Sequence, residues 1–306
     1  MKLRRMAKRP HRAPQVQRGI ISESDRHSPK VRWTFRFING TTLIFLLIVG
    51  LGPLLWLAKS SITPTQDTIR NPMSLWPHGF DLGNFAKAWS KTHIDRYFLN
   101  TVWIAIGSWL VQIVVATTGG YALSVLRPRF ARVLTAMVLA TLFVPSIVLL
   151  VPLYLTIVDA PLVHIKLIDT FWAVWLPAGA SAFNVLLMKR FFDNLPREIF
   201  EAAQVDGAGP FRLFWSIVLP LSRPIVGVVS VFAVIATWKD FLWPLLVLPN
   251  PNMQPLSVRL PTLQPTTPLD IFLAALAIAT LIPVVLFLVF QRMFLQGGDV
   301  SGAVKG

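Results

Sequence analysis

Long apolar runs separated by short polar segments dominate the chain after residue 36. A hydrocarbon core about 30 Å thick needs about 20 helical residues, because no backbone polar group can remain unpaired in lipid. Windows of sufficient length with few or no charged side chains therefore predict membrane spans, and they are 37–58, 97–126, 133–158, 170–188, 224–248 and 271–291. The pattern predicts an all-α integral membrane protein with six transmembrane helices.

Several of these windows contain proline, which removes a backbone donor and would break a helix in water. Proline is tolerated in membrane helices because neighbouring groups satisfy the freed carbonyls. We therefore expect kinked helices at the internal prolines, which are Pro53, Pro145, Pro152, Pro177, Pro244 and Pro283.

The composition agrees with a membrane protein. Hydrophobic residues make up 54% of the 306 residues and charged residues 14%, whereas soluble domains average about 25% charged residues. The chain has no cysteine, which excludes a disulfide framework, a thiolate metal site and a cysteine nucleophile.

The formal net charge of +15 indicates orientation. Most of the 29 Lys and Arg residues lie in residues 1–36, in the loop before residue 133, in the segment 189–223 and in the C-terminal tail. Basic residues accumulate on the cytoplasmic side of a membrane protein, so both termini are expected in the cytoplasm. The membrane itself is expected to be the inner or plasma membrane. This distribution also argues against nucleic-acid binding. Residues 1–36 lack hydrophobic periodicity and are predicted to form a disordered basic cytoplasmic tail.

The sequence offers no catalytic constellation. It contains no phosphate-binding loop, no His-Glu-x-x-His zinc motif and no Gly-x-Ser-x-Gly motif. Lys239 and Asp240 are adjacent, so on a helix they would point about 100° apart and could not face one site. We expect no enzymatic activity, no metal site and no cofactor bound by this chain.

The polar segment 194–220 contains two short helical patterns separated by a turn. Pro196 suits the first turn of a helix, and Gly207 supplies a stop. Apolar residues recur at helical spacing at Ile199, Ala202, Ala203, Val205, Phe211, Phe214 and Ile217. The polar face of the first predicted helix carries acids, whereas the polar face of a helix resting on anionic lipid would favour Lys or Arg. We predict two amphipathic helices at right angles that bind a protein partner on the cytoplasmic face.

The same segment resembles a known motif. Glu201-Ala202-Ala203, Gly207, Ile217 and Leu219-Pro220 stand at the spacing of the Glu-Ala-Ala loop of permease subunits of ATP-binding-cassette (ABC) importers. Asp206-Gly207-Ala208 is similar to the form in carbohydrate-uptake permeases, specifically the relatives of the shorter membrane subunit of the maltose transporter. Residues 97–101, 238–244 and 302–306 also resemble that subfamily, so the likeness extends over about residues 38–306.

The resemblance implies a type I ABC importer permease fold and a set of partners. These would be a second, different permease subunit, a dimer of separate ATPases that binds ATP and Mg²⁺, and an extracytoplasmic solute-binding protein. The helices of segment 194–220 would dock in a groove of the ATPase, as a helix packs in a groove. The residues expected to dock are Glu198, Glu201, Ala202, Ala203, Asp206, Gly207, Ala208, Ile217, Leu219 and Pro220.

The resemblance suggests further contacts. Lys305 and Gly306 would reach the ATPase, although they could equally be a frayed end. Asn250, Asn252 and Gln254 lie in the proline-rich segment 249–261, which cannot form a regular helix and would contact the binding protein or act as a stiff linker.

Polar residues within the spans are candidates for a solute pathway, because such side chains tend to face a protein interior. They are Asn100, Gln112, Asn184, Lys239 and Asp240. Lys239 departs from the family form, in which an uncharged amide precedes the acid. Small residues at Gly119, Gly120 and Gly179 to Ser181 are more typical of helix packing than of ligand contact.

The leading interpretation is a permease subunit of a carbohydrate importer. One alternative within the same class is a permease for glycerol phosphate or a polyol. A self-contained secondary carrier would show inverted repeats with matching broken helices, and the six dissimilar windows show none.

Overall fold

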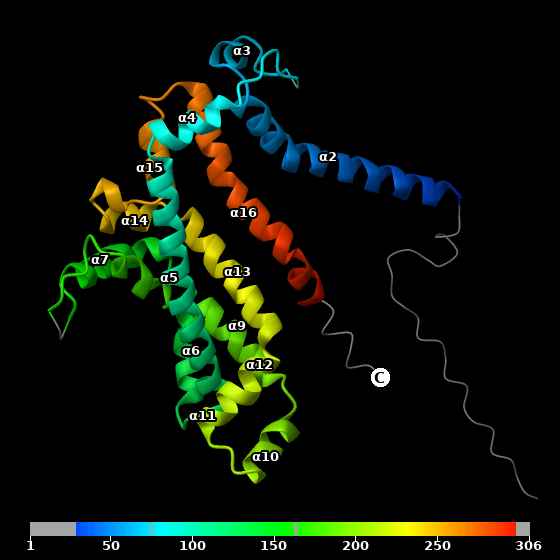
Figure 1. Ribbon diagram of the computed structural model, residues 1–306. Helices are drawn as coiled ribbons and strands as arrows, with labels where there is room; N and C mark the ends of the chain where they lie inside the picture. The colour runs from blue at the N-terminus through cyan, green and yellow to red at the C-terminus, as the bar shows by residue number, and fades with distance from the viewer. Residues whose placement is uncertain (1–28, 75, 162–163, 298–306) are drawn as a thin grey trace, which may run out of the picture. The chain divides into compact units, whose positions relative to one another are not determined.

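The computed structural model describes residues 29–74, 76–161 and 164–297, the last eight of these without side chains (Figure 1). Every regular element within these ranges is helical. The chain divides after Trp56 into two units, residues 1–56 and 57–306.

The first unit consists, in its described part, of most of α2 (Pro29–Ser61). The expected disordered tail was predicted to extend to residue 36, but the helix already begins at Pro29, a residue that helices accept in their first turn. The expected tail from residue 1 to 28 lies outside the described residues. An 18-residue window of α2 has a mean hydropathy of 2.2, as a spanning helix requires.

Helix α5 (Ile94–Tyr121) is the axis of the second unit, with α9 (Ala182–Asp193) and α13 (Arg223–Lys239) packed along it (Figure 1). It continues as the π-helical turn η1 (Ala122–Leu126), so helical structure covers the whole of the predicted window 97–126. Gly120 permits the close approach of α9, since a methyl group there would lie 2.8 Å from Met188 Cβ. The predicted packing role of the small residues is therefore confirmed at this position.

The predicted span 133–158 is not one straight helix. It consists of α6 (Ala131–Thr141), followed by the short 3-10 turn η2 (Ser146–Leu149) and α7 (Leu150–Val158), with a bend of 100°. Pro145 lies at the break with an extended backbone, because its ring prevents the helix from continuing through it.

The predicted span 170–188 is also broken. Helix α8 (Trp172–Ala178) ends after Pro177, and α9 begins at Ala182 and continues beyond the predicted end. The Ser181 side chain accepts a weak hydrogen bond of 3.4 Å from the Asn184 backbone N–H at the start of α9. Gly179 lies against α5, where an added methyl group would approach Val111 Cγ1 to 2.7 Å.

The helix in the fifth window, 224–248, is interrupted before the end of the window. Helix α13 stops at Lys239, Asp240 is extended, and α14 (Leu242–Val247) follows. The last window, 271–291, lies within the single helix α16 (Leu269–Gly297), which accommodates Pro283. By length and apolar composition, three helices in the described part of the chain could cross a membrane, or five if each sharply bent pair counts as one.

Short helices lie beside the start of α5 and the start of α16. They are α3 (Thr65–Arg70), α4 (Gly83–Lys91), the 3-10 turn η4 (Pro251–Met253) and α15 (Leu256–Leu263). The prediction that segment 249–261 forms no regular helix is wrong for α15. Pro255 precedes its first residue, where no helical hydrogen bond is lost, and Pro261 near its end removes only one donor.

Candidate functional site

The segment between α9 and α13 folds into the two predicted short helices. Helix α10 (Arg197–Val205) starts directly after Pro196, and Gly207 ends it with a φ of 73°, a left-handed conformation that glycine adopts without strain. The Ala208 N–H donates to Ala203 O over 2.9 Å and the Gly207 N–H to Gln204 O over 3.0 Å. This pair of bonds is a Schellman motif, which satisfies the last carbonyls of the helix. The predicted turn at Gly207 is confirmed.

Helix α10 has one exposed face and one buried face. Glu198, Glu201, Ala202 and Val205 follow the i, i+3, i+4, i+7 spacing and are all exposed, with Val205 at 88%. Ala203 lies on the opposite face, where it is 6% exposed and belongs to an apolar cluster of its own chain. In this structure the helix therefore uses Ala203 to pack on its own core, and docking of Ala203 on a partner stays a prediction.

Three acids lie on or beside the exposed face of α10. Within the described ranges, Glu198, Glu201 and Asp206 form no ion pair. Each is exposed, next to apolar side chains that are also exposed. We call the exposed stripe Glu198, Glu201, Ala202 and Val205, together with Asp206 and Phe211, the coupling surface. Phe211 is 77% exposed. A surface that combines large apolar groups with unpaired acids suits a basic protein partner.

The second half of the segment is attached to the core. It comprises α11 (Pro210–Leu213), the π-helical turn η3 (Phe214–Val218) and α12 (Leu219–Leu221). Leu213, Phe214 and Val218 are buried, and Ile217 and Leu219 pack against the same cluster. A bend of 79° after α12 leads into α13. Of the predicted docking residues in this half, Pro220 is exposed, whereas Ile217 and Leu219 are partly buried.

Tyr121 connects this segment to α5, a role that the sequence interpretation missed. Its hydroxyl donates a hydrogen bond to Pro210 O over 2.8 Å, and its ring lies 5.0 Å from that of Phe214. The side chain is only 6% exposed. A tyrosine near the end of a predicted span was the available signal, since a buried hydroxyl normally needs a partner. The contact joins the long helix directly to the start of α11.

A carboxylate lies beside the same end of α5. Asp193, at the end of α9, accepts hydrogen bonds from Lys189 Nζ over 2.6 Å and from Ser124 Oγ over 2.7 Å, and Arg127 lies 3.7 Å away. Partial burial alone would raise the pKa of this carboxyl group, but these two hydrogen bonds and the nearby positive charges outweigh it and lower the pKa below its ordinary value of 3.8. Asp193 therefore stays ionised and joins α9 to the end of α5.

Two of the predicted pathway residues contact each other. Asn184 Nδ2 donates to Gln112 Oε1 over 2.7 Å, and the two side chains are 4% and 6% exposed. The contact joins α9 to α5 inside the helix assembly. Their polar groups therefore serve at least the packing of these helices.

The predicted pathway residue Asn100 contacts the loop that was predicted to bind the solute-binding protein. Asn100 Nδ2 donates to the backbone carbonyls of Asn252 and Gln254 over 2.8 and 3.1 Å, and Arg96 donates to Asn252 Oδ1 over 2.6 Å. Gln254 is buried and donates its side-chain amide to Leu248 O. Asn250 Oδ1 accepts from the Asn252 N–H over 3.0 Å. The loop is thereby fastened to the start of α5 instead of extending freely.

Asp240 occupies the break between α13 and α14. Its carboxylate accepts a weak hydrogen bond of 3.5 Å from the Trp243 N–H, and its backbone carbonyl accepts one of 2.6 Å from Ser257 Oγ. The side chain borders a cavity of about 330 Å³ that η2 and α7 also line. Lys239 is exposed. Because Asp240 is extended, the helical geometry assumed for the Lys239 and Asp240 pair does not apply.

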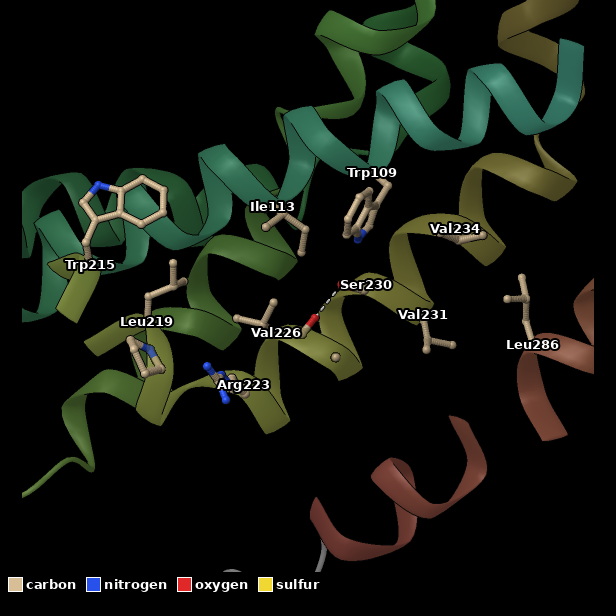
Figure 2. A pocket seen from close by; sticks show the side chains of 12 residues that line it. Trp109, Ile113, Trp215, Leu219, Arg223, Val226, Ser230, Val231, Val234 and Leu286 are labelled. Carbon is tan, nitrogen blue, oxygen red and sulfur yellow. Dashed lines mark hydrogen bonds between the residues drawn. The ribbon is translucent and has the colours of Figure 1, made fainter. Parts of the chain in front are cut away.

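A larger cavity of about 690 Å³ lies between α5, the segment 215–220, α13 and α16. Figure 2 shows Trp109 and Ile113 of α5 on one side of it and Val226 and Ser230 of α13 on the other. The walls are mostly apolar. Ser230 Oγ is bonded to Val226 O, and Trp109 Nε1 is buried without a partner among the described residues. None of the five predicted pathway residues lines this cavity.

Comparisons with known proteins agree with this architecture. Residues 112–297 match the family described as the binding-protein-dependent transport system inner membrane component. The chain is 32% identical over 270 residues to an arabinooligosaccharides transport system permease of Halalkalibacterium halodurans, covering 86% of this chain and 94% of that one. It is 30% identical over 273 residues to an sn-glycerol-3-phosphate transport system permease of Agrobacterium fabrum, covering 86% and 95%.

A third relative is a diacetylchitobiose uptake system permease of Streptomyces coelicolor, 30% identical over 273 residues, with 87% of this chain and 88% of the relative covered. Among solved structures, the fold is similar to a chain of a bacterial ABC transporter involved in the import of the acidic polysaccharide alginate. That match has a TM-score of 0.74 at 20% identity and covers 90% of this chain and 99% of the other. Helices, Glu-Ala-Ala segment and family match agree: the chain belongs to the inner membrane components of binding-protein-dependent transport systems and is an ABC transporter permease subunit.

Proposed function

We propose that this chain is a permease subunit of an ATP-driven carbohydrate importer, in which it forms the solute pathway together with a second, different permease. Two of the three relatives described above are named for oligosaccharides, which supports a carbohydrate. Glycerol phosphate is the second candidate, because the glycerol-3-phosphate permease has the same 30% identity to the chain as the diacetylchitobiose permease. Binding measurements on the accompanying solute-binding protein, with both solute classes, would distinguish the two.

The coupling surface is the observation that carries the proposed mechanism. Four residues on one face of α10 are exposed at helical spacing, and the two acids among them have no partner in the described part of the chain. A groove on a separate ATPase with basic side chains at its edge would complement this face. ATP and Mg²⁺ would bind to that ATPase and not to this chain.

Movement of the coupling surface would reach the spans through two connections. Tyr121 bonds the start of α11 to α5, and Leu219 and Pro220 lead through the 79° bend into α13. Closure of an ATPase dimer would thus displace α5 and α13 together. Such rigid-body movement is a common way of switching a pathway between two faces of a membrane.

The proposed topology retains six spans with both termini in the cytoplasm. It counts α2, α5 and α16 as continuous spans, the bent α6–α7 pair and the broken α8–α9 pair as one each, and α13 with α14 as the sixth. Helix bends inside membrane proteins are tolerated where they are covered by protein or line a cavity. In this topology most basic residues lie on the same side of the membrane as the two termini, which supports the orientation because it follows the positive-inside rule.

In this proposal a second subunit completes the solute pathway, because most of the predicted pathway residues bond within this chain. Gln112 and Asn184 bond to each other, and Asn100 is fastened to the outer loop. Asp240 at its helix break stays a candidate for solute contact, with Lys239 beside it. The fastened loop with Asn250, Asn252 and Gln254 would present a stable surface to the binding protein. Contact of Lys305 and Gly306 with the ATPase stays a prediction outside the described residues.

The direct test is Glu201→Lys in the assembled transporter. Charge reversal on the coupling surface should lower transport-linked ATP hydrolysis and solute uptake in proteoliposomes at least tenfold, and it should weaken retention of the ATPase during purification. Asp159→Lys is the matched control, because Asp159 is exposed in a different loop outside the coupling surface. Normal uptake by Glu201→Lys would contradict the proposed docking surface.

A further inference from the structure

An open cleft of about 710 Å³ lies between the turn that joins η1 to α6 and the end of α9. Its walls carry Arg127, Arg129, Arg132 and Lys189, with Asp193 as the one acid among the lining residues. We call it the basic cleft. It shares no lining residue with the apolar cavity beside Trp109. Arg127 and Asp193 also line a smaller adjoining pocket of about 270 Å³ that reaches Glu201 of the coupling surface.

The positive charges of the basic cleft are only partly used within the chain. Asp193 is held by Lys189 at 2.6 Å and lies 3.7 Å from Arg127, whose Nε donates to Ser124 O over 2.6 Å. Arg129 and Arg132 are exposed and form no ion pair with any described residue. Two guanidinium groups thus remain available to an anion.

The backbone presents these groups in a defined turn. Arg127 has a φ of 45°, a left-handed conformation that ends η1, and its N–H donates to Ala122 O over 3.1 Å. The Ala131 N–H then donates to Pro128 O over 2.7 Å, just before α6 begins. Arg129 lies in this turn and Arg132 in the first turn of α6, so both reach the cleft from a short, hydrogen-bonded stretch.

Exposed apolar side chains surround the same turn. Leu126 is 49% exposed, Phe130 is 70% exposed, Val133 is 59% exposed and Met137 is 62% exposed. Guanidinium groups beside exposed apolar groups are typical of the depth at which headgroups meet acyl chains. A free inorganic anion would make use of the charges but would leave these apolar surfaces in water.

We propose that the basic cleft binds the phosphate headgroup of an anionic phospholipid, with the acyl chains lying along the apolar residues of the turn and of α6. Arginine binds phosphate oxygens through paired N–H donors, and basic pockets between helices at a membrane surface bind such headgroups. Under the proposed orientation the lipid belongs to the cytoplasmic leaflet. The binding itself does not depend on which solute is transported.

The test uses the complete transporter complex with phosphatidylglycerol as the probe and phosphatidylcholine as the neutral comparison. Native mass spectrometry and the thermal unfolding shift would report binding. Each basic residue near an anionic surface contributes about fivefold in affinity, so Arg129→Gln with Arg132→Gln should weaken phosphatidylglycerol binding about 25-fold. Arg190→Gln, an exposed base on α9 outside the cleft, removes one nearby charge without changing the cleft and should weaken binding at most about fivefold.

Two further arms keep the outcome decisive. Arg129→Lys with Arg132→Lys retains the charge and should retain most of the binding, which separates a folding defect from loss of the site. Inorganic phosphate and ATP are added in place of lipid, and equal protection by either would overturn the lipid assignment in favour of a soluble phosphate ligand. Unchanged phosphatidylglycerol binding by the double Gln variant would overturn the site.

Discussion

Asn184 and Gln112 form a hydrogen bond of 2.7 Å between their side chains across the contact of α9 with α5, at positions that are 4% and 6% exposed. The bond connects a broken helix to the long central one. In an apolar interior, an amide that loses its partner cannot turn to water.

This pairing predicts non-additive effects of substitution. Asn184→Leu should lower the free energy of unfolding by about 1–2 kcal/mol, because it leaves Gln112 Oε1 unpaired. Gln112→Leu should have a similar effect, and the double variant should lose less than the sum of both. Unfolding of the purified chain in detergent, followed by circular dichroism, measures the cycle. Strict additivity would show that the bond contributes nothing.

The adjacent glycines Gly119 and Gly120 on α5 should differ in how well they tolerate substitution by alanine. A methyl group at Gly120 would lie 2.8 Å from Met188 Cβ and 2.9 Å from the Lys189 backbone nitrogen, so Gly120→Ala should cost about 1–3 kcal/mol of stability. Gly119→Ala places its methyl group 3.3 Å from Val185 Cγ1, a flexible side-chain end. That variant should change stability little and serves as the control in a thermal unfolding assay. Equal losses in both would contradict the close helix contact.

Removal of one hydroxyl should weaken the link between the coupling surface and α5. Tyr121→Phe loses the bond to Pro210 O and keeps the ring contact with Phe214. We expect a stability loss of about 1 kcal/mol and fewer solute molecules transported per ATP hydrolysed. Tyr154→Phe, in α7, is the control. An unchanged ratio of transport to hydrolysis would exclude a coupling role for the Tyr121 hydroxyl.

The ionised state of Asp193 should make stability depend on pH in acid. Its pKa is lowered in the folded protein, so its contribution is fully present above the ordinary value of 3.8 and is lost as pH falls through the lower folded-state pKa. Asp193→Asn should therefore be less stable than the unmodified chain at neutral pH, and the two should converge in strong acid.

Ser124→Ala tests the cause of that shift, since it removes one of the two hydrogen bonds that lower the pKa of Asp193. The acid transition should move towards higher pH in this variant. Unfolding followed by fluorescence between pH 2 and 7, roughly the range over which a carboxyl group titrates, provides the measurement. A transition at the same pH in all three proteins would mean that Asp193 does not govern it.

Apolar length and charge distribution were sufficient to predict an all-helical membrane chain, the continuous helices α5 and α16, and the turn at Gly207. These features depend on local physics: lipid demands about 20 apolar residues per span, and glycine accepts a positive φ. The internal prolines predicted irregular helices, but the number of prolines in a window did not show whether its helix would bend and continue or would break. At the 100° bend beside Pro145, the Phe143 and Val144 N–H groups donate to Ala140 O and Thr141 O in local turns, a detail that proline content does not reveal.

The sequence by itself determined the class of the protein, the place of the Glu-Ala-Ala segment and the acids that make it unusual beside basic neighbours. Only the tertiary structure decided which groups meet. It turned Ala203 inward, paired Gln112 with Asn184, bonded Tyr121 to Pro210 and gathered arginines around a cleft. Helical periodicity assigns a residue to a face of its own helix, whereas the neighbour opposite that face depends on how distant segments pack.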